Sequence, residues 1–345
     1  MPTRFRVGIT RDFLKPDGAL GFGDIGLDVL AEDSRIEREF LPDYGSELPP
    51  HVADQFDALL VLAPKVTATT LDGGKRLSLV ARFGVGFDNV DVPACTRNNV
   101  LLTITPSGVR RPVAVSALAL LLALSHKLLA KDRMTREGRW HEKLNEMGVG
   151  LTGRTLGLIG LGNIGREILR VVAPLEMRPA AFDPFVSAEA ARSSGVQLLS
   201  LESLLEQSDF VCVCCALTPE TRHLLNRERL ARMKPTAFLI NVARGPIVDQ
   251  AALTDILRER RIAGAALDVF EQEPISLTDP LLKLDNVILS PHAICWTDEL
   301  FLGNGRAACR SILDVAAGRI PESVVNRDVV GRPGLLNKLA RLAEK

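Results

Sequence analysis

Three glycines at the end of an apolar run constrain the fold of this chain more than any other feature. The run from Thr155 to Ile159 is followed by Gly160-Leu-Gly162-Asn-Ile-Gly165, and a helical pattern then begins. In a strand-turn-helix, Gly160 allows the tight turn, Gly162 lets a pyrophosphate approach the backbone, and Gly165 lets the helix pack closely on the sheet. Free N–H groups and the dipole at the helix N-terminus favour an anion. The segment therefore predicts a dinucleotide-binding turn.

An acidic residue at the end of the next apolar run fits the same interpretation. The run from Met177 to Phe182 is followed by Asp183, 18 residues after Gly165. A carboxylate there suits a ribose diol and repels the additional phosphate of NADP, so the sequence predicts NAD as the cofactor. The alternative is a surface aspartate beside an unrelated glycine turn.

The composition indicates a globular protein without a general attraction for polyanions. The 345 residues are enough for about two domains. Lys plus Arg equals Asp plus Glu, at 42 each, so we expect no binding to nucleic acid or to anionic membranes. The N-terminus lacks a signal-peptide pattern, and the most apolar stretch, Pro112–Leu124, is shorter than the ~20 residues of a membrane span. These features predict a cytoplasmic location.

The cysteines give no metal-site pattern. Cys212, Cys214 and Cys215 fall in one buried-strand pattern, where neighbouring side chains point to opposite faces and are poorly placed to share a metal. We therefore predict reduced core thiols and no metal site.

Strand patterns alternate with helical patterns along most of the chain, which predicts parallel, doubly wound sheets. Strands are expected at 5–9, 58–62, 77–83, 100–105, 210–215, 237–242, 263–269 and 287–289. Helices are expected at 112–139, 220–233, 249–260 and 297–317. We predict an α/β fold in which a dinucleotide unit, residues 106–295, is inserted into a second, discontinuous domain made of residues 1–105 and 296–345. Two sequential domains with a separate helical tail are the alternative.

Three segments deliver polar side chains at the predicted carboxyl ends of strands. Arg244 follows the strand pattern at 237–242, Asp268 lies at the end of 263–269, and His292 follows 287–289. Ligands of open parallel sheets bind outside these strand ends, so the three side chains should converge on one crevice with Gly162. Taken singly, each has a structural alternative, such as a capping arginine or a histidine that only satisfies a loop.

The order of these segments resembles the NAD-dependent D-2-hydroxyacid dehydrogenases over nearly the whole chain. The stretch 82–91, Arg-Phe-Gly-Val-Gly-Phe-Asp-Asn-Val-Asp, is similar to the substrate loop of that family. In the family the catalytic glutamate directly precedes a proline, which selects Glu273 over Glu271 here. The resemblance implies two Rossmann-like domains, of which the inserted one binds NAD and the discontinuous one binds substrate. It implies hydride transfer between NAD(H) and a small D-2-hydroxy or 2-oxo acid of the glyoxylate, hydroxypyruvate or phosphoglycerate type.

The residue types support the roles that this resemblance implies. His292 would exchange a proton with the C2 oxygen of the substrate, and Glu273 would hold the imidazole tautomer and favour its charged form. Arg244 offers a fixed fork of donors to the substrate carboxylate. Backbone N–H groups of Val85 and Gly86 would complete the carboxylate site.

The resemblance also implies a set of cofactor contacts. Asn163 and Ile164 would present N–H groups to the pyrophosphate, and Asp268 would meet the nicotinamide amide. The full expected set comprises Gly160, Gly162, Asn163, Ile164, Gly165, Asp183, Cys215, Val242, Ala243 and Asp268.

Some residues have no settled role at this stage. Arg110 and Arg111 depart from the polar or acidic residues usual in the family, and could serve an anionic substrate tail or lie on a solvated helix start. Trp296 could wall the substrate pocket or simply pack. His51, His126 and His223 are assigned no role.

The family suggests a homodimer, with the helix at 112–139 and the loop around Trp140 as its interface. No regulatory domain is expected after the last helix. Two other functions are alternatives: an NAD-sensing binding protein with little turnover, and a methyltransferase with a glycine-rich turn. The Arg244, Glu273 and His292 set argues against both.

Overall fold

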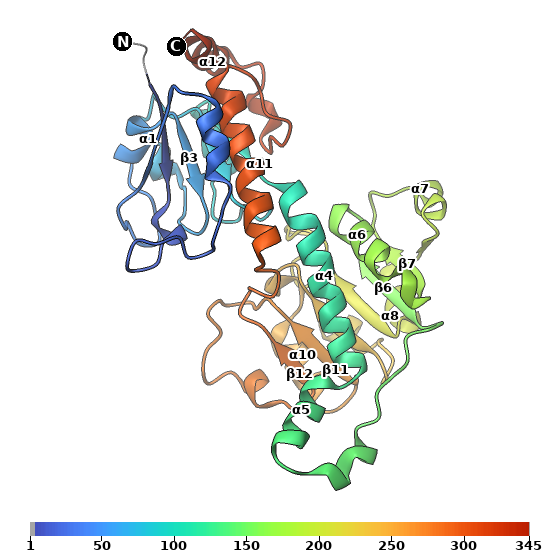
Figure 1. The fold of residues 1–345 in the computed structure, drawn as a ribbon. Coiled ribbons are helices and arrows are strands. Elements are labelled where there is room, and N and C mark those ends of the chain that lie inside the picture. Colours follow the sequence, from blue (N-terminus) through green and yellow to red (C-terminus); the bar gives the residue numbers. More distant parts are fainter. Residues whose placement is uncertain (1–3, 345) are drawn as a thin grey trace. The chain divides into compact units, whose positions relative to one another are not determined.

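A computed structural model describes residues 4–344 of the chain. It divides into two compact units, which we call the terminal unit (residues 1–109 and 296–345) and the central unit (residues 110–295). Each unit has its own parallel β-sheet with helices packed against it (Figure 1). The predicted fold class, two parallel-sheet α/β domains of which one is inserted into the other, is confirmed.

The sheet of the terminal unit has five parallel strands in the order β2-β1-β3-β4-β5. Its strands are β1 (Phe5–Ile9), β2 (Ile36–Phe40), β3 (Ala58–Val61), β4 (Leu79–Arg82) and β5 (Leu101–Thr103). Strand β2 was not predicted from the sequence, because its three central residues, Glu37, Arg38 and Glu39, are charged. They are exposed, and as an edge strand β2 pairs only with β1, so it needs no continuous apolar pattern.

Helices on the terminal sheet come from both ends of the sequence. The N-terminal part supplies α1 (His51–Gln55), α2 (Ala68–Leu71) and α3 (Val92–Arg97), and the C-terminal part supplies α11 (Asp298–Ala316) and α12 (Pro333–Ala343). The Thr297 side chain caps α11 by accepting from the Leu300 N–H. At Gly305 a Cβ would overlap the carbonyl oxygen of Ile25, so only glycine lets α11 approach the N-terminal part this closely.

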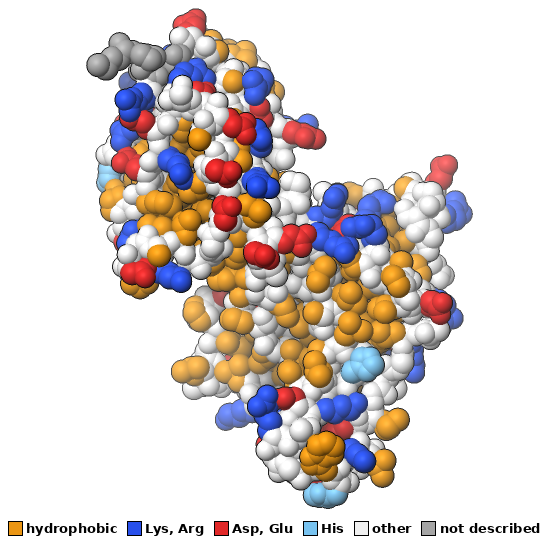
Figure 2. Space-filling model, in the orientation of Figure 1, with side chains coloured by type: hydrophobic (Ala, Val, Ile, Leu, Met, Phe, Trp, Pro, Cys, Tyr) orange, Lys and Arg blue, Asp and Glu red, His pale blue; other side chains and the backbone are white. Residues whose placement is uncertain are grey.

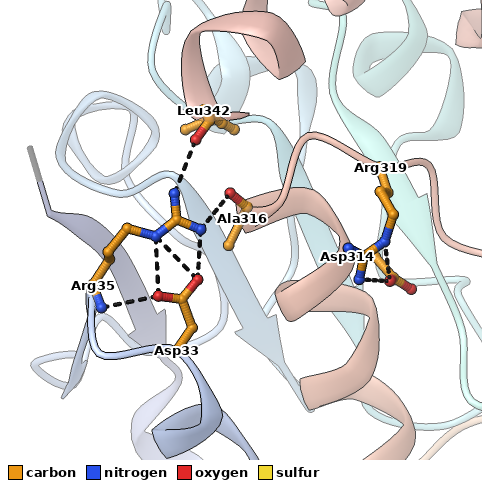
Figure 3. A network of polar contacts seen from close by, with 6 residues as sticks. All are labelled: Asp33, Arg35, Asp314, Ala316, Arg319 and Leu342. Carbon is orange, nitrogen blue, oxygen red and sulfur yellow. Dashed lines mark hydrogen bonds and ion pairs between the residues drawn. The ribbon is translucent and has the colours of Figure 1, made fainter. Parts of the chain in front are cut away.

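A partly buried arginine joins the N-terminal part of the chain to the C-terminal helices (Figure 3). Arg35 pairs with Asp33, with 2.6 Å between Nη2 and Oδ2, and donates to the carbonyls of Ala316 at 3.1 Å and Leu342 at 3.4 Å. The hydrogen bond from Arg35 holds the pKa of Asp33 below its usual value, against the opposing effect of burial. The ends of α11 and α12, which lie some 300 residues along the chain, are thereby fixed to the segment before β2.

The sheet of the central unit has seven parallel strands in the order β12-β11-β10-β9-β6-β7-β8. They are β6 (Thr155–Ile159), β7 (Arg178–Phe182), β8 (Gln197–Leu198), β9 (Phe210–Val213), β10 (Phe238–Asn241), β11 (Gly264–Leu267) and β12 (Val287–Leu289). The chain moves outward in one direction from β6 and in the other from β9. The strand order therefore reverses between β6 and β9, where ligands of doubly wound sheets bind at the carboxyl ends.

Alternate residues of the central strands enter two separate cores. In β9, Phe210 and Cys212 face one core and Val211 and Val213 face the other. The first core is covered by α4 (Pro106–Ser125) and α6 (Asn163–Val172). The second is covered by α8 (Leu201–Gln207), α9 (Arg227–Leu230) and α10 (Gln250–Arg258). A short α7 (Ala188–Ser193) follows β7.

The predicted single helix at 112–139 is wrong in both its start and its continuity. Helix α4 begins at Pro106 and ends at Ser125, and α5 (Leu128–Arg136) follows after Lys127, whose φ of 52° is left-handed and cannot continue a helix. Within the described residues, α4 alone is long and apolar enough to cross a membrane, at 20 residues and a mean hydropathy of 1.5. Half of this window is buried inside the protein, as in a core helix.

The predicted helix at 220–233 is also shorter in the structure. Only α9 is helical, because Thr218 and Thr221 form a turn through their side-chain oxygens and His223 has a φ of 50°. Side-chain hydroxyls that bond the nearby backbone compete with helix formation, which explains the error.

A cluster of arginines surrounds one buried carboxylate between α4 and α6. Arg170 donates to Glu167 at 2.6 Å and Arg111 at 3.2 Å, and Arg110 lies 3.9 Å away. Figure 2 shows the basic side chains gathered on this part of the surface. The hydrogen bond from Arg170, assisted by Arg111 and opposed by burial, lowers the pKa of Glu167 to about 2.

The Glu167 cluster predicts a pH-dependent contribution to stability. Because the folded-state pKa lies below the unfolded value of about 4.3, the contribution is complete above that pH and is lost as the pH falls toward 2. Glu167→Gln should lower the Tm at pH 7, since three guanidinium groups lose their shared anion. The Tm difference from wild type should shrink between pH 6 and pH 3, whereas the exposed control Glu189→Gln should show little difference. A Tm difference that is constant with pH would contradict this.

Candidate active site

The glycine turn has the geometry that an anion-binding strand-turn-helix requires. Gly160 follows β6 with a φ of 103°, and a Cβ on it would lie 2.9 Å from the Cα of Cys215. Gly162 is the N-cap of α6, and a Cβ on it would meet nothing within 4 Å, so the backbone there is open to a ligand. At Gly165 a Cβ would overlap the Gly160 carbonyl oxygen. Asn163 and Ile164 occupy the first turn of α6, whose N–H groups have no carbonyl of an earlier turn to bond.

Asp183 lies beside this turn, as its predicted role requires. Its Oδ2 accepts from the Leu161 N–H at 2.8 Å and its Oδ1 from the Phe185 N–H at 2.9 Å. The carboxylate is therefore held at the end of β7, next to the end of β6. A carboxylate oxygen can accept more than one hydrogen bond, so these contacts leave capacity for a ribose diol.

Glu273 and His292 form a direct side-chain pair. The distance between His292 Nδ1 and Glu273 Oε2 is 2.8 Å, and Glu273 Oε1 accepts from the Phe270 N–H at 3.0 Å. Burial by itself would raise the pKa of Glu273, but the hydrogen bonds from His292 and Phe270 and the charge of Arg244 outweigh it and lower the pKa. Glu273 therefore remains a carboxylate at neutral pH.

Arg244 is presented by a tight turn after β10. The side chain of Asn241, which is buried, accepts from the Ala243 N–H at 3.0 Å and donates to the Arg244 carbonyl at 3.0 Å. Arg244 itself donates to the Ala243 carbonyl at 2.7 Å. Directly after it, a Cβ on Gly245 would overlap the carbonyl group of Phe270, so the turn that carries Arg244 lies against the segment that leads to Glu273.

Asp268 has a structural duty that the sequence did not suggest. It is 4% exposed at the end of β11, and its Oδ1 accepts from the N–H groups of Ala293 at 3.0 Å and Ile294 at 3.1 Å. Burial raises the pKa of Asp268, although these bonds and that of Ser290 oppose the shift. The carboxylate thus fixes the loop after β12 in which His292 takes a φ of 54°. Its predicted contact with the nicotinamide stays a prediction.

The remaining predicted cofactor contacts lie at neighbouring strand ends. Cys215 follows β9, and burial raises the pKa of its thiol to about 11, so it is protonated. Val242 and Ala243 follow β10, and the Val242 N–H donates to the Val213 carbonyl at 3.4 Å. All six cysteines of the chain are free thiols. Residues 4–344 contain no group of three or more His, Cys, Asp or Glu side chains that could hold a metal ion.

The predicted substrate residues of the terminal unit follow β4. Val85 and Gly86 come after Gly84, which has a φ of 128° and donates from its N–H to Thr105 Oγ1 at 2.8 Å. Their contact with a substrate carboxylate stays a prediction. Trp296 packs edge-on against Phe22 at 5.1 Å between ring centroids, which favours the packing alternative, although about half of it is exposed.

Sequence reasoning missed a second histidine–glutamate pair in the central unit. His223 Nε2 lies 2.8 Å from Glu271 Oε1, two residues before Glu273. No spacing in the sequence reveals this pair, because the two residues lie 48 positions apart in irregular segments. Arg110 and Arg111, considered for the substrate, are both engaged with Glu167.

The chain is similar in sequence and in fold to known proteins. Residues 118–293 match the family model of the D-isomer specific 2-hydroxyacid dehydrogenase NAD-binding domain. A glyoxylate reductase of Korarchaeum cryptofilum is 39% identical over 86% of this chain and 93% of its own length. A D-3-phosphoglycerate dehydrogenase of Archaeoglobus fulgidus is 39% identical over 79% of this chain but only 52% of its own length, so the chain spans about half of that relative.

A solved structure is similar to this chain over most of its length. A protein of Thermus thermophilus superposes with a TM-score of 0.80 and 32% identity, over 93% of this chain and 100% of its own. The family match and the curated relatives together establish the reaction class as NAD-linked oxidoreduction of hydroxy and oxo acids. The chain belongs to the D-isomer specific 2-hydroxyacid dehydrogenase family.

Proposed function

We propose that Arg244, Glu273 and His292 are the catalytic residues with which this dehydrogenase interconverts small 2-oxo acids and D-2-hydroxy acids. The observation that carries the proposal is the 2.8 Å contact between Glu273 and His292, with the Arg244 charge acting on the same carboxylate. These residues follow β10, β11 and β12, whose carboxyl ends share the edge of the sheet that also carries the glycine turn.

In the proposed mechanism each side chain has one task. When bound, NADH supplies the hydride that adds to C2 of the oxo acid. His292 uses Nδ1 for Glu273, so Nε2 is the ring nitrogen left to donate a proton to the C2 oxygen. The ionised Glu273 stabilises the imidazolium and fixes its tautomer, and Arg244 binds the substrate carboxylate through its fork of donors.

The residues present fit a nicotinamide dinucleotide. The open backbone at Gly162 and the N-terminus of α6 suit the pyrophosphate, and Asp183 suits the adenosine ribose. We infer a preference for NAD over NADP from the Asp183 carboxylate. The alternative of a binding protein with little turnover is not favoured, because the relatives are named as reductases and dehydrogenases.

For the substrate we propose glyoxylate and similarly small 2-oxo acids such as hydroxypyruvate. Several relatives that match most of this chain and most of their own length are named glyoxylate reductase. We propose a cytoplasmic location on the same basis, since these relatives are metabolic enzymes.

We also propose that the chain forms a homodimer through the face that carries α4, α5 and the 3₁₀ turn Trp140–Asn145. Apolar side chains here are exposed, including Trp140 at 65%, Leu144 at 78% and Met147 at 72%. Figure 2 shows hydrophobic side chains gathered over α4. A second copy of the chain would cover the half of α4 that is not buried within the protein.

The acid–base role predicts a loss in turnover without a loss of cofactor affinity. His292→Ala should lower kcat by ~10²-fold or more, because the C2 oxygen loses its proton donor. The NADH Kd, measured by fluorescence titration, should stay near the wild-type value. His51→Ala, which removes an exposed histidine of the terminal unit, is the control and should retain full kcat. Normal turnover in His292→Ala would remove the proposed proton donor.

The charge on Glu273 predicts the direction of a pH shift. Glu273 is ionised at neutral pH, and its charge is expected to favour the protonated form of the ring that donates to the C2 oxygen, which would extend oxo-acid reduction to higher pH. Glu273→Gln removes that stabilisation, and the pH at which the rate of reduction is halved should move downward. The measurement is kcat for reduction from pH 5 to pH 9. An unchanged alkaline limb would show that Glu273 does not support the charged imidazole.

The position of Asp183 predicts cofactor selectivity. Wild type should have a higher kcat/KM with NADH than with NADPH, because the carboxylate repels the additional phosphate. Asp183→Asn keeps one of the two oxygens that accept backbone N–H groups and loses the charge, and should narrow the ratio of the two kcat/KM values by on the order of tenfold. Equal values in wild type, or a preference for NADPH, would contradict the assignment.

The exposed apolar face predicts the oligomeric state. Wild type should sediment as a dimer, and the double variant Trp140→Asp with Leu144→Asp should sediment as a monomer, because two carboxylates would be buried in the interface. Leu277→Asp, at a residue 92% exposed outside this face, is the matched control and should remain a dimer. A monomeric wild type, or a dimeric double variant, would refute the proposed interface.

A further inference from the structure

The pair of His223 and Glu271 lies next to the proposed catalytic glutamate. The distance between His223 Nε2 and Glu271 Oε1 is 2.8 Å, and Glu271 precedes Glu273 by two residues. His223 comes from the turn between β9 and α9, so this contact joins an otherwise separate segment to the turn Phe270–Glu273. The proposed mechanism gives neither residue a task.

Glu271 is also anchored to the start of α10. Its Oε1 accepts from the Gln250 N–H at 3.1 Å, and its own N–H donates to Gln250 Oε1 at 3.0 Å. Gln250 is held in turn by its Nε2, which donates to Asp279 Oδ2 at 2.8 Å. A carboxylate at the N-terminus of a helix is favoured by the helix dipole. The Oε1 atom of Glu271 therefore contacts both the first N–H group of α10 and the imidazole of His223.

The backbone of His223 is fixed to the segment that follows Arg244. The His223 N–H donates to the Pro246 carbonyl at 2.8 Å, and Leu225 forms a parallel bridge with Val248. On the other side of that segment, Gly245 lies against the backbone of Phe270. His223 thus has its backbone on the Arg244 segment and its side chain on the Glu273 segment.

We propose that His223 is a positioning residue that acts through Glu271. Together with Gln250 it holds the turn Phe270–Glu273 so that the Glu273 carboxylate faces His292. This inference rests on the proposed function, because it assigns His223 an effect on the Glu273–His292 pair. His223 does not touch the substrate and exchanges no proton with it.

The expected effects on kcat and on global stability distinguish a positioning role from a purely structural one. The side chains of His223 and Glu271 are 43% and 35% exposed, and a polar side-chain contact as exposed as this contributes little to global stability. A catalytic group displaced by about 1 Å can nevertheless cost on the order of 10²-fold in rate. Loss of the imidazole should therefore be visible in kcat and in local backbone protection, and hardly in the Tm.

The test compares His223→Ala with His223→Gln, in wild type and in Glu273→Gln. Alanine keeps the Cβ, so the strain of the 50° φ at position 223 is the same and only the contact is lost. Glutamine retains an N–H donor that can reach Glu271. Glu271→Gln alters the other residue of the His223–Glu271 contact. His51→Ala, which loses a histidine contact to Tyr44 in the terminal unit, is the control.

The expected result is a split between kcat and KM. His223→Ala should lower kcat by on the order of tenfold with a nearly unchanged KM for the oxo acid, and Glu271→Gln should act in the same direction. His223→Gln should restore most of the rate. In the Glu273→Gln background, His223→Ala should cause no further loss of kcat. The carboxylate whose position His223 is proposed to set is already absent in that variant. Full kcat in His223→Ala, or multiplied losses in the double variant, would overturn the proposal.

Hydrogen exchange gives a readout that does not depend on turnover. In His223→Ala the peptides that cover residues 268–275 should exchange faster than in wild type, while those of β6 and α6 should not change. Unchanged exchange in 268–275 would overturn the proposal. If wild type fails to turn over any 2-oxo acid, or His292→Ala is fully active, the proposed function fails, and the exchange data still decide whether His223 holds the turn.

Discussion

The close approach of Gly245 to the backbone of Phe270 is the constraint on which the proposed site depends. A side chain at position 245 would overlap the Phe270 carbonyl group, so the turn after β10 and the loop after β11 can lie together only with glycine here. Parallel strands bring their carboxyl ends to one edge, but this contact sets how closely the Arg244 and Glu273 segments approach. The Arg244 charge then acts on the same carboxylate that holds His292.

Two buried or partly buried carboxylates divide the work around His292. Asp268 accepts two backbone N–H groups and fixes the loop, whereas Glu273 contacts the imidazole itself. Their pKa values move in opposite directions, since burial dominates at Asp268 and hydrogen bonds with neighbouring charges dominate at Glu273. Asp268 therefore holds the loop after β12, and Glu273 holds the imidazole ring of His292. We infer that His223, through its contact with Glu271, helps to hold the Glu273 carboxylate in place.

Much of this arrangement could be predicted from the sequence, because the signals were local. Apolar runs ending in Gly160, Arg244 or His292 predicted both the sheets and the edge at which these residues lie. Features set by tertiary contacts could not be predicted. Strand β2 has a charged centre and forms only at the edge of its sheet, and the expected long helix is interrupted at Lys127, whose backbone is left-handed. The His223 contact was missed for the same reason, since a side-chain turn replaced the expected helix.

The stereochemistry of the product decides whether the protein catalyses the proposed reaction. Purified protein would be incubated with NADH and hydroxypyruvate, and the glycerate formed would be resolved by chiral chromatography against the NADH consumed. We expect D-glycerate in an amount equal to the NADH oxidised, because the chain belongs to a D-isomer specific family and each hydride that adds to C2 is accompanied by one proton on the C2 oxygen. L-glycerate, a racemic product, or NADH oxidation without glycerate would contradict it.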